Sequence, residues 1–164
     1  MWKEVDSNLD LSVKQIKKLV YDNYGFICSI KKLDGEKDLN YRLISKSKKK
    51  YYLKIYPNKT DLSFVRFQTK LLDYLSKKLK TPINIKSKKN SNFCHFTDEN
   101  EFIRYFRINS WIDGRAWSKV NPINKELRIK LGKEAALITK KLKNFRNNYS
   151  NSKMQWDISN SLWT

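Results

Sequence analysis

The feature that most limits the fold of this chain is a long helical pattern that separates two groups of predicted strands. Asp61 can cap this helix, and Thr81-Pro82 breaks it. Between them, apolar residues lie on or near one helix face: Leu62, Val65, Leu72, Leu75 and Leu79. Because the helix follows the third strand of a mostly antiparallel series, the pattern predicts an α+β fold and excludes a doubly wound sheet.

The three predicted strands before this helix follow a shorter amphipathic helix over residues 12–24. Ser12 can cap that helix, and Gly25 can stop it in a left-handed conformation. The strands are predicted at residues 27–33, 39–44 and 51–56. The turn Asp34-Gly35-Glu36-Lys37 joins the first two strands, and Pro57 ends the third.

The residues after the long helix predict two or three more strands and a last helix. Residues 83–85 and 93–96 are predicted to form a hairpin across a Lys-, Asn- and Ser-containing turn, and residues 101–108 another strand. Pro122 is expected to open the last helix, in which apolar residues keep helical spacing from Leu127 to Leu142. The sheet should therefore contain about five strands, with one helix between strands three and four.

The net charge of +19 comes mainly from lysine, which outnumbers arginine four to one. A basic domain can bind nucleic acid by displacing counterions from phosphates, but arginine is the residue preferred for bidentate phosphate and base contacts. The densest lysine runs, at residues 46–50 and 86–90, fall in predicted strand connections, where solvated hairpin tips are expected. A basic nucleic-acid-binding module therefore stays open as an alternative function.

Composition also excludes several other classes. No apolar run approaches the roughly 20 residues of a membrane-spanning helix, and the first residues lack a signal-peptide core. Cys28 and Cys94 cannot build a disulfide framework. With the single histidine, His95, they are too few for a structural zinc site. We therefore expect a cytoplasmic protein with no membrane partner and no metal site of its own.

Three features in this order along the chain favour a phosphate-binding site. The first turn holds a lone glycine, Gly35, among charged residues; Lys54 lies near the end of the third strand between Leu53 and Ile55; and Gln68 interrupts the apolar pattern of the long helix. Exposed turn amides can donate to phosphate oxygens, and an ammonium on a rigid strand is a positioned cation. Each feature alone is common on a solvated surface, so their combination carries the prediction.

With these motifs, the chain resembles the N-terminal part of a small-molecule kinase of the aminoglycoside-phosphotransferase superfamily, closest to hydroxylysine-kinase-like proteins. The resemblance runs from about Asp34 to Ile158. It rests on Gly35-Glu36-Lys37-Asp38-Leu39-Asn40-Tyr41, Tyr52-Leu53-Lys54-Ile55, Phe67-Gln68-Thr69-Lys70-Leu71-Leu72, Arg107-Ile108-Asn109-Ser110-Trp111-Ile112-Asp113-Gly114-Arg115, Leu131-Gly132, Phe145 and Trp156-Asp157.

The resemblance implies a kinase-like N-terminal lobe over residues 1–112, with ATP or GTP and Mg²⁺ as phosphoryl donor and an amine-bearing alcohol as acceptor. The first turn and the third-strand lysine would contact the phosphates, and backbone groups after the fifth strand would contact the purine. The expected nucleotide-contacting residues are Gly35, Glu36, Lys37, Asp38, Asn40, Lys54, Ser110, Trp111 and Ile112.

The resemblance also implies catalytic residues that this sequence does not contain. The family carries a His-x-Asp-x-x-x-x-Asn loop and a later metal-binding aspartate, but no such pattern follows residue 114. We therefore expect residues 113–164 to be the hinge exit and the first helical segment of an incomplete C-terminal lobe. The chain would then bind nucleotide without catalytic or metal-ligating residues, unless a separate polypeptide supplies the missing lobe. A non-catalytic interaction module, with an exposed apolar face around Trp111, Trp117 and Trp156, is the other alternative.

Overall fold

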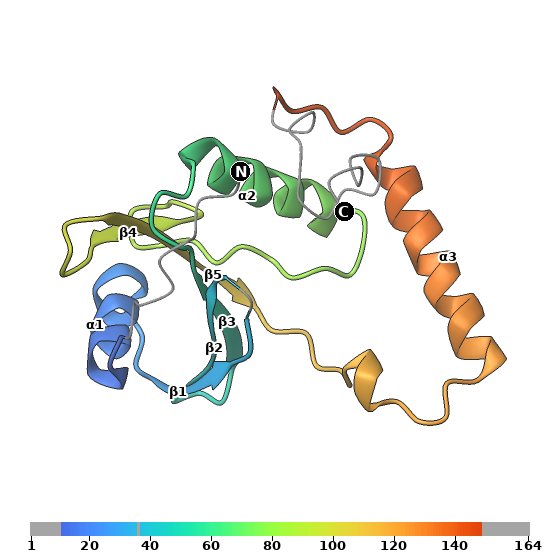
Figure 1. The fold of residues 1–164 in the computed structure, drawn as a ribbon, viewed down its shortest axis with the longest axis horizontal. Helices are drawn as coiled ribbons and strands as arrows, with labels where there is room; N and C mark the ends of the chain where they lie inside the picture. Colours follow the sequence, from blue (N-terminus) through green and yellow to red (C-terminus); the bar gives the residue numbers. More distant parts are fainter. Residues whose placement is uncertain (1–10, 36, 149–164) are drawn as a thin grey trace, which may run out of the picture.

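A five-stranded antiparallel sheet forms the centre of the computed structural model, which describes residues 11–35 and 37–148 (Figure 1). The strand order is β1-β2-β3-β5-β4. This architecture confirms the predicted α+β fold, with α2 between the third and fourth strands. In chain order the elements are α1 (Val13–Tyr24), β1 (Cys28–Leu33), β2 (Leu39–Ser45), β3 (Lys50–Ile55), α2 (Leu62–Ser76), β4 (Cys94–Thr97), β5 (Ile103–Ser110), the 3₁₀ turn η1 (Trp117–Lys119) and α3 (Lys125–Leu142).

Local capping determines where α1 and α2 begin. The Ser12 hydroxyl accepts from the Gln15 backbone N–H while the Gln15 side chain accepts from the Ser12 N–H, which makes a capping box. The Asp61 carboxylate caps α2 by accepting from the Ser63 N–H at 2.8 Å. Gly25 ends α1 with a φ of 78°, a conformation that favours glycine.

The two faces of the sheet differ in chemistry. Side chains alternate along a strand, and one face is apolar and packs against Ile16 and Val20 of α1. The buried residues of this core face are Tyr41, Leu43, Leu53, Ile55, Phe106 and Ile108. The positions between them point to the opposite side, which we call the polar face: Asn40, Arg42, Tyr52, Lys54, Arg107 and Asn109.

The predicted hairpin between residues 83–85 and 93–96 is wrong. Asn84 forms an antiparallel bridge with Asn109, and the Ile85 N–H donates to the Ile108 carbonyl at 2.9 Å. β4 pairs with the other end of β5. The two segments therefore run end to end along β5, and residues 86–93 are an excursion between them that is held to α1 by the Lys88 N–H, which donates to the Asn23 carbonyl.

The last helix also differs from its prediction. α3 begins at Lys125, because Asn124 rather than Pro122 provides its cap by accepting from the Leu127 N–H at 2.8 Å. Figure 1 shows α3 standing apart from the sheet. Its C-terminal end is tied to α2, since the Tyr74 hydroxyl donates to the Lys141 carbonyl at 3.0 Å and the Tyr74 ring lies 5.1 Å from that of Phe145.

Several large apolar side chains of α3 stay exposed: Ile129, Leu131, Leu137 and Ile138. Leu131 and Ile138 are seven residues apart and therefore lie on one face of the helix, which another surface could cover. Across residues 11–35 and 37–148, no helix has the length and apolar character needed to cross a bilayer.

Candidate functional site

The ammonium group of Lys54 lies under the turn that joins β1 and β2. Its Nζ is 2.6 Å from Oδ2 of Asp38, and the two side chains are only 15% and 26% exposed. The Nζ also lies 5.0 Å from the centre of the Tyr56 ring. The structure therefore brings together the strand lysine and the turn that the sequence analysis placed at one site.

The shape of this turn depends on Gly35 and Asn40. The Asn40 amide Nδ2 donates to the carbonyls of Asp34 and Asp38, both at 3.4 Å, and its Oδ1 accepts from the Tyr52 hydroxyl. A Cβ at position 35 would lie 2.3 Å from Asn40 Nδ2 and 2.4 Å from the Asp38 carbonyl oxygen, so only glycine fits.

A cavity of about 480 Å³ runs along the same turn, lined by residues 32–35 and 37–39. Lys37 and the carboxylate-bearing Asp38 are on its wall. Glu36, which the sequence analysis also placed here, lies outside the described residues.

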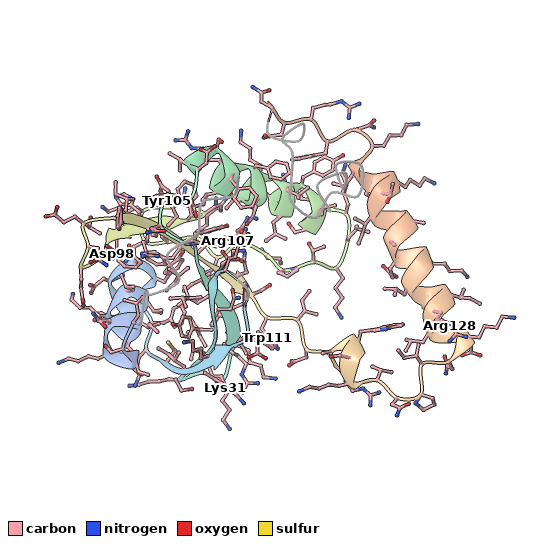
Figure 2. All side chains as sticks on the ribbon, in the orientation of Figure 1. Lys31, Asp98, Tyr105, Arg107, Trp111 and Arg128 are labelled. Carbon is pink, nitrogen blue, oxygen red and sulfur yellow. The ribbon has the colours of Figure 1, made fainter. Side chains whose placement is uncertain are left out.

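Arg107 is the residue of this site that sequence reasoning did not assign. It lies directly opposite Lys54 in the β3–β5 pair, so both side chains point to the polar face. Figure 2 shows Arg107 between the sheet and α2. Arg107 is only 9% exposed, and its Nε and Nη1 groups have no hydrogen-bond partner within the described part of the chain.

The glutamine of α2 contacts Arg107 and not Lys54. Gln68 Oε1 accepts from the Tyr56 hydroxyl at 2.8 Å and from Arg107 Nη2 at 3.3 Å. Burial raises the pKa of Tyr56, although the Arg107 charge works in the opposite direction, so the phenol stays protonated and able to donate. Gln68 thus positions the guanidinium of Arg107 from one side, while the ammonium of Lys54 pairs with Asp38.

A buried amide network fixes α2 against the polar face. Asn109 Nδ2 donates to Asn84 Oδ1 at 2.7 Å, and Asn84 Nδ2 donates to the Thr69 carbonyl at 2.9 Å and to Asp73 Oδ1 at 2.8 Å. Because Asn84 and Asn109 are both buried, these bonds satisfy groups that would otherwise be costly to desolvate.

The chain leaves the sheet at Ser110, Trp111 and Ile112, the three residues expected to contact a purine. The Ser110 N–H donates to the Ile83 carbonyl at 2.9 Å, and the Trp111 N–H reaches the Lys50 carbonyl at 3.4 Å. In the described residues, the backbone N–H of Ile112 has no such partner, and Ile112 is 39% exposed. Trp111, labelled in Figure 2, is held by a hydrogen bond from its indole to Asp113 at 3.1 Å.

Two solved structures of small-molecule kinases share this fold. An amicoumacin kinase in complex with AMP-PNP and Ca²⁺ superposes with a TM-score of 0.72 at 17% sequence identity, over 89% of this chain and 45% of that one. A microcompartment-associated aminopropanol kinase superposes with a TM-score of 0.67 at 12% identity, over 87% of this chain and 44% of that one. The fold is that of a kinase-like N-terminal lobe.

The likeness is one of fold. The chain spans a little under half the length of each neighbour. No family model matches the sequence, and no curated protein matches it significantly.

The single histidine and the two cysteines lie on β1 and β4, outside the β1–β2 turn. His95 is exposed on β4, where its ring is 6.5 Å from that of Tyr105. Cys28 is buried and Cys94 half-buried, both as free thiols. Within residues 11–35 and 37–148, no three His, Cys, Asp or Glu side chains are grouped as metal ligands. Trp117 is 39% exposed, and Trp156 lies outside the described residues.

The chemistry of the polar face fits a phosphorylated ligand better than a metal ion. The lysine ammonium and the orphaned guanidinium N–H groups are donors, and donors recognise phosphate oxygens. Asp38 already shows that an anion can be held at Lys54. A nucleotide bound here would supply the transferable phosphoryl group, and the residues of this chain would bind and orient it.

Proposed function

We propose that this chain provides the nucleotide-binding lobe of an ATP- or GTP-dependent small-molecule phosphotransferase. The observation that carries the proposal is the placement of Lys54, a mostly buried ammonium on β3 of a kinase-like lobe, beneath the β1–β2 turn. Kinases use a lysine on this strand to grip the nucleotide phosphates.

In this proposal each part of the site has a separate role. Lys54 binds a phosphate oxygen, and the backbone of the turn around Gly35 approaches the phosphates because no side chain blocks it there. The N–H of Ile112, which has no backbone acceptor among the described residues, donates to the purine. Asp38 competes with phosphate for Lys54, so nucleotide binding exchanges one anion for another.

The acceptor and the catalytic residues belong to the wider protein. We propose an amine-bearing alcohol of the hydroxylysine type as acceptor, which agrees in class with the aminopropanol named for one structural neighbour. Residues 1–112 would form the nucleotide-binding lobe, and residues 113–164 would start the second lobe. The exposed apolar residues of α3, such as Leu131 and Ile138, support the packing of further protein there, from the same or a separate polypeptide.

The proposal is tested by isothermal titration calorimetry with AMP-PNP and Mg²⁺. Lys54→Met should weaken binding about 10- to 100-fold, since charge-assisted hydrogen bonds contribute about 1.5–3 kcal/mol. Lys48→Met, which removes the same charge from the exposed β2–β3 turn, should bind like wild type. Wild-type protein without measurable nucleotide affinity, or a Lys54→Met variant that binds normally, would contradict the proposal.

The nucleic-acid alternative predicts the opposite pattern. RNA affinity would then fall steeply with salt, and Lys48→Met rather than Lys54→Met would weaken it.

A further inference from the structure

Arg107 carries a buried positive charge that no acidic side chain neutralises within residues 11–35 and 37–148. None of the ion pairs among the described residues involves it. The guanidinium has five potential N–H donors. Its Nη2 reaches Gln68, while Nε and Nη1 have no partner in the part of the chain that the structure describes. A buried cation without an anion, and with unsatisfied donors, is strongly disfavoured unless something else compensates for it.

The position of this charge makes the arrangement more unfavourable still. Arg107 is directly opposite Lys54, and like charges at opposed positions of an antiparallel pair repel each other. Among the described residues, Asp38 forms its ion pair with Lys54 and none with Arg107. The Tyr56 ring, 5.8 Å from the guanidinium carbon, and the neutral Gln68 amide offer weaker stabilisation than a carboxylate would. An aliphatic residue at position 107 would serve a purely structural role better.

We propose that Arg107 is a second phosphate-binding cation, which acts beside Lys54 on the polyphosphate group of the ligand. This inference rests on the proposed function and adds a residue and a specificity to it. The planar guanidinium matches two phosphate oxygens at once, while the lysine is a single point of positive charge. Two adjacent cations select a nucleoside di- or triphosphate over a monophosphate.

The exposures of the three side chains indicate where the anion enters. Lys54 and Asp38 keep 15% and 26% of their surface, whereas the Nε and Nη1 atoms of Arg107 are fully covered. The incoming phosphate therefore meets Lys54 first and displaces the Asp38 carboxylate. The guanidinium of Arg107, which Gln68 already holds in position, then binds the phosphate from the buried side of the site.

The inference is tested by calorimetric titration of wild type, Arg107→Met and Arg107→Lys with AMP-PNP, AMP and adenosine. Arg107→Met should weaken AMP-PNP binding about tenfold or more, with little change for adenosine or AMP. Arg107→Lys should recover part of the lost affinity, because it restores the charge but not the planar guanidinium that bonds two oxygens at once. Arg66→Met on the exposed side of α2 is the matched control and should bind like wild type.

The outcomes separate this inference from the proposed function. If Lys54→Met loses AMP-PNP but a folded Arg107→Met binds it normally, the role of Arg107 is wrong and the proposed function stands. An equal loss of affinity for adenosine and AMP-PNP in Arg107→Met would also overturn the inference, because it would indicate a structural role for Arg107. If wild type binds no nucleotide, both fail.

A measurement on the wild type covers the case in which Arg107→Met does not fold. The Nε–H of Arg107 can be followed by NMR in ¹⁵N-arginine-labelled protein, with its assignment taken from contacts to the Tyr56 ring. AMP-PNP should shift this signal and adenosine should not. An unchanged signal at saturating AMP-PNP would overturn the inference.

Discussion

Asp38 and Lys54 form a partly buried ion pair of 2.6 Å between the β1–β2 turn and the third strand. The pair holds the turn against the polar face, where Asn40 also bonds to it. The Asp38 carboxylate is paired with the ammonium that we propose for phosphate binding. The turn therefore stabilises the ligand-free lobe and lowers the affinity for the ligand. The same contact therefore affects both stability and affinity.

Replacing Asp38 by asparagine should raise the affinity for AMP-PNP about three- to tenfold, which corresponds to at most about 1.4 kcal/mol. The reason is that the ligand no longer has to displace a carboxylate or approach a negative charge. Asp34→Asn is the matched control, because the backbone carbonyl of Asp34, not its carboxylate, bonds to Asn40. Calorimetry with each variant checks the prediction, and weaker binding by Asp38→Asn would show that Asp38 helps to hold the ligand.

Gly35→Ala and Gly132→Ala should have opposite effects on stability. At Gly35 the added methyl would overlap the Asp38 carbonyl and Asn40, so the turn has to shift, at a cost of about 1–3 kcal/mol. At Gly132, inside α3, the new Cβ meets nothing within 4 Å, so alanine should stabilise by up to about 1 kcal/mol through its helix propensity. Urea unfolding measures both, and a neutral Gly35→Ala would mean that the turn adapts freely.

Asn84→Ala should destabilise the lobe by about 2–3 kcal/mol, because it removes the acceptor of the buried Asn109 amide and one donor each from Asp73 and the Thr69 carbonyl. Asn92→Ala should cost less, since Asn92 is only half-buried and makes a single bond to Asp73. Thermal unfolding ranks the two variants. An equal loss of stability in the two variants would indicate that the burial of Asn84 does not determine what its hydrogen bonds contribute.

The buried pair of Asp98 and Arg104 should make stability depend on acid pH. The two side chains are 0% and 3% exposed. Burial alone would raise the pKa of Asp98, but hydrogen bonds from Arg104 and from the backbone of Phe102 and Asn100 outweigh it and lower the pKa. A carboxylate with a lowered folded-state pKa contributes stability above its unfolded value of about 3.9, and this contribution is lost as the pH falls through the folded pKa.

Asp98→Asn should therefore lower stability at pH 7 by about 3 kcal/mol, since it leaves Arg104 buried without a counter-ion. Between pH 7 and pH 3 its unfolding free energy should also fall less than that of wild type. Asp22→Asn, from the exposed pair with Lys18, should follow the wild-type curve. Urea titrations across this range test the prediction, and parallel curves for Asp98→Asn and wild type would count against it.

Local patterns predicted most of the elements, and non-local pairing explains the errors. Ser12, Gly25 and Asp61 act on backbone groups within four residues, so their roles were visible in the sequence. The pairing of residues 83–85 was not, because β5 offers one edge to two separate segments. Nothing in the alternation of apolar residues distinguishes that arrangement from a hairpin.

The amino-acid order by itself determined the α+β class, the position of α2 and the placement of Lys54 on a strand after a glycine turn. Only the tertiary structure decided that Asp38 meets Lys54, that Arg107 lies opposite it and that Gln68 serves the arginine. The physical reason is that caps, turns and periodicity act over a few residues. The register between β3 and β5 depends instead on the packing of the whole sheet against α1 and α2.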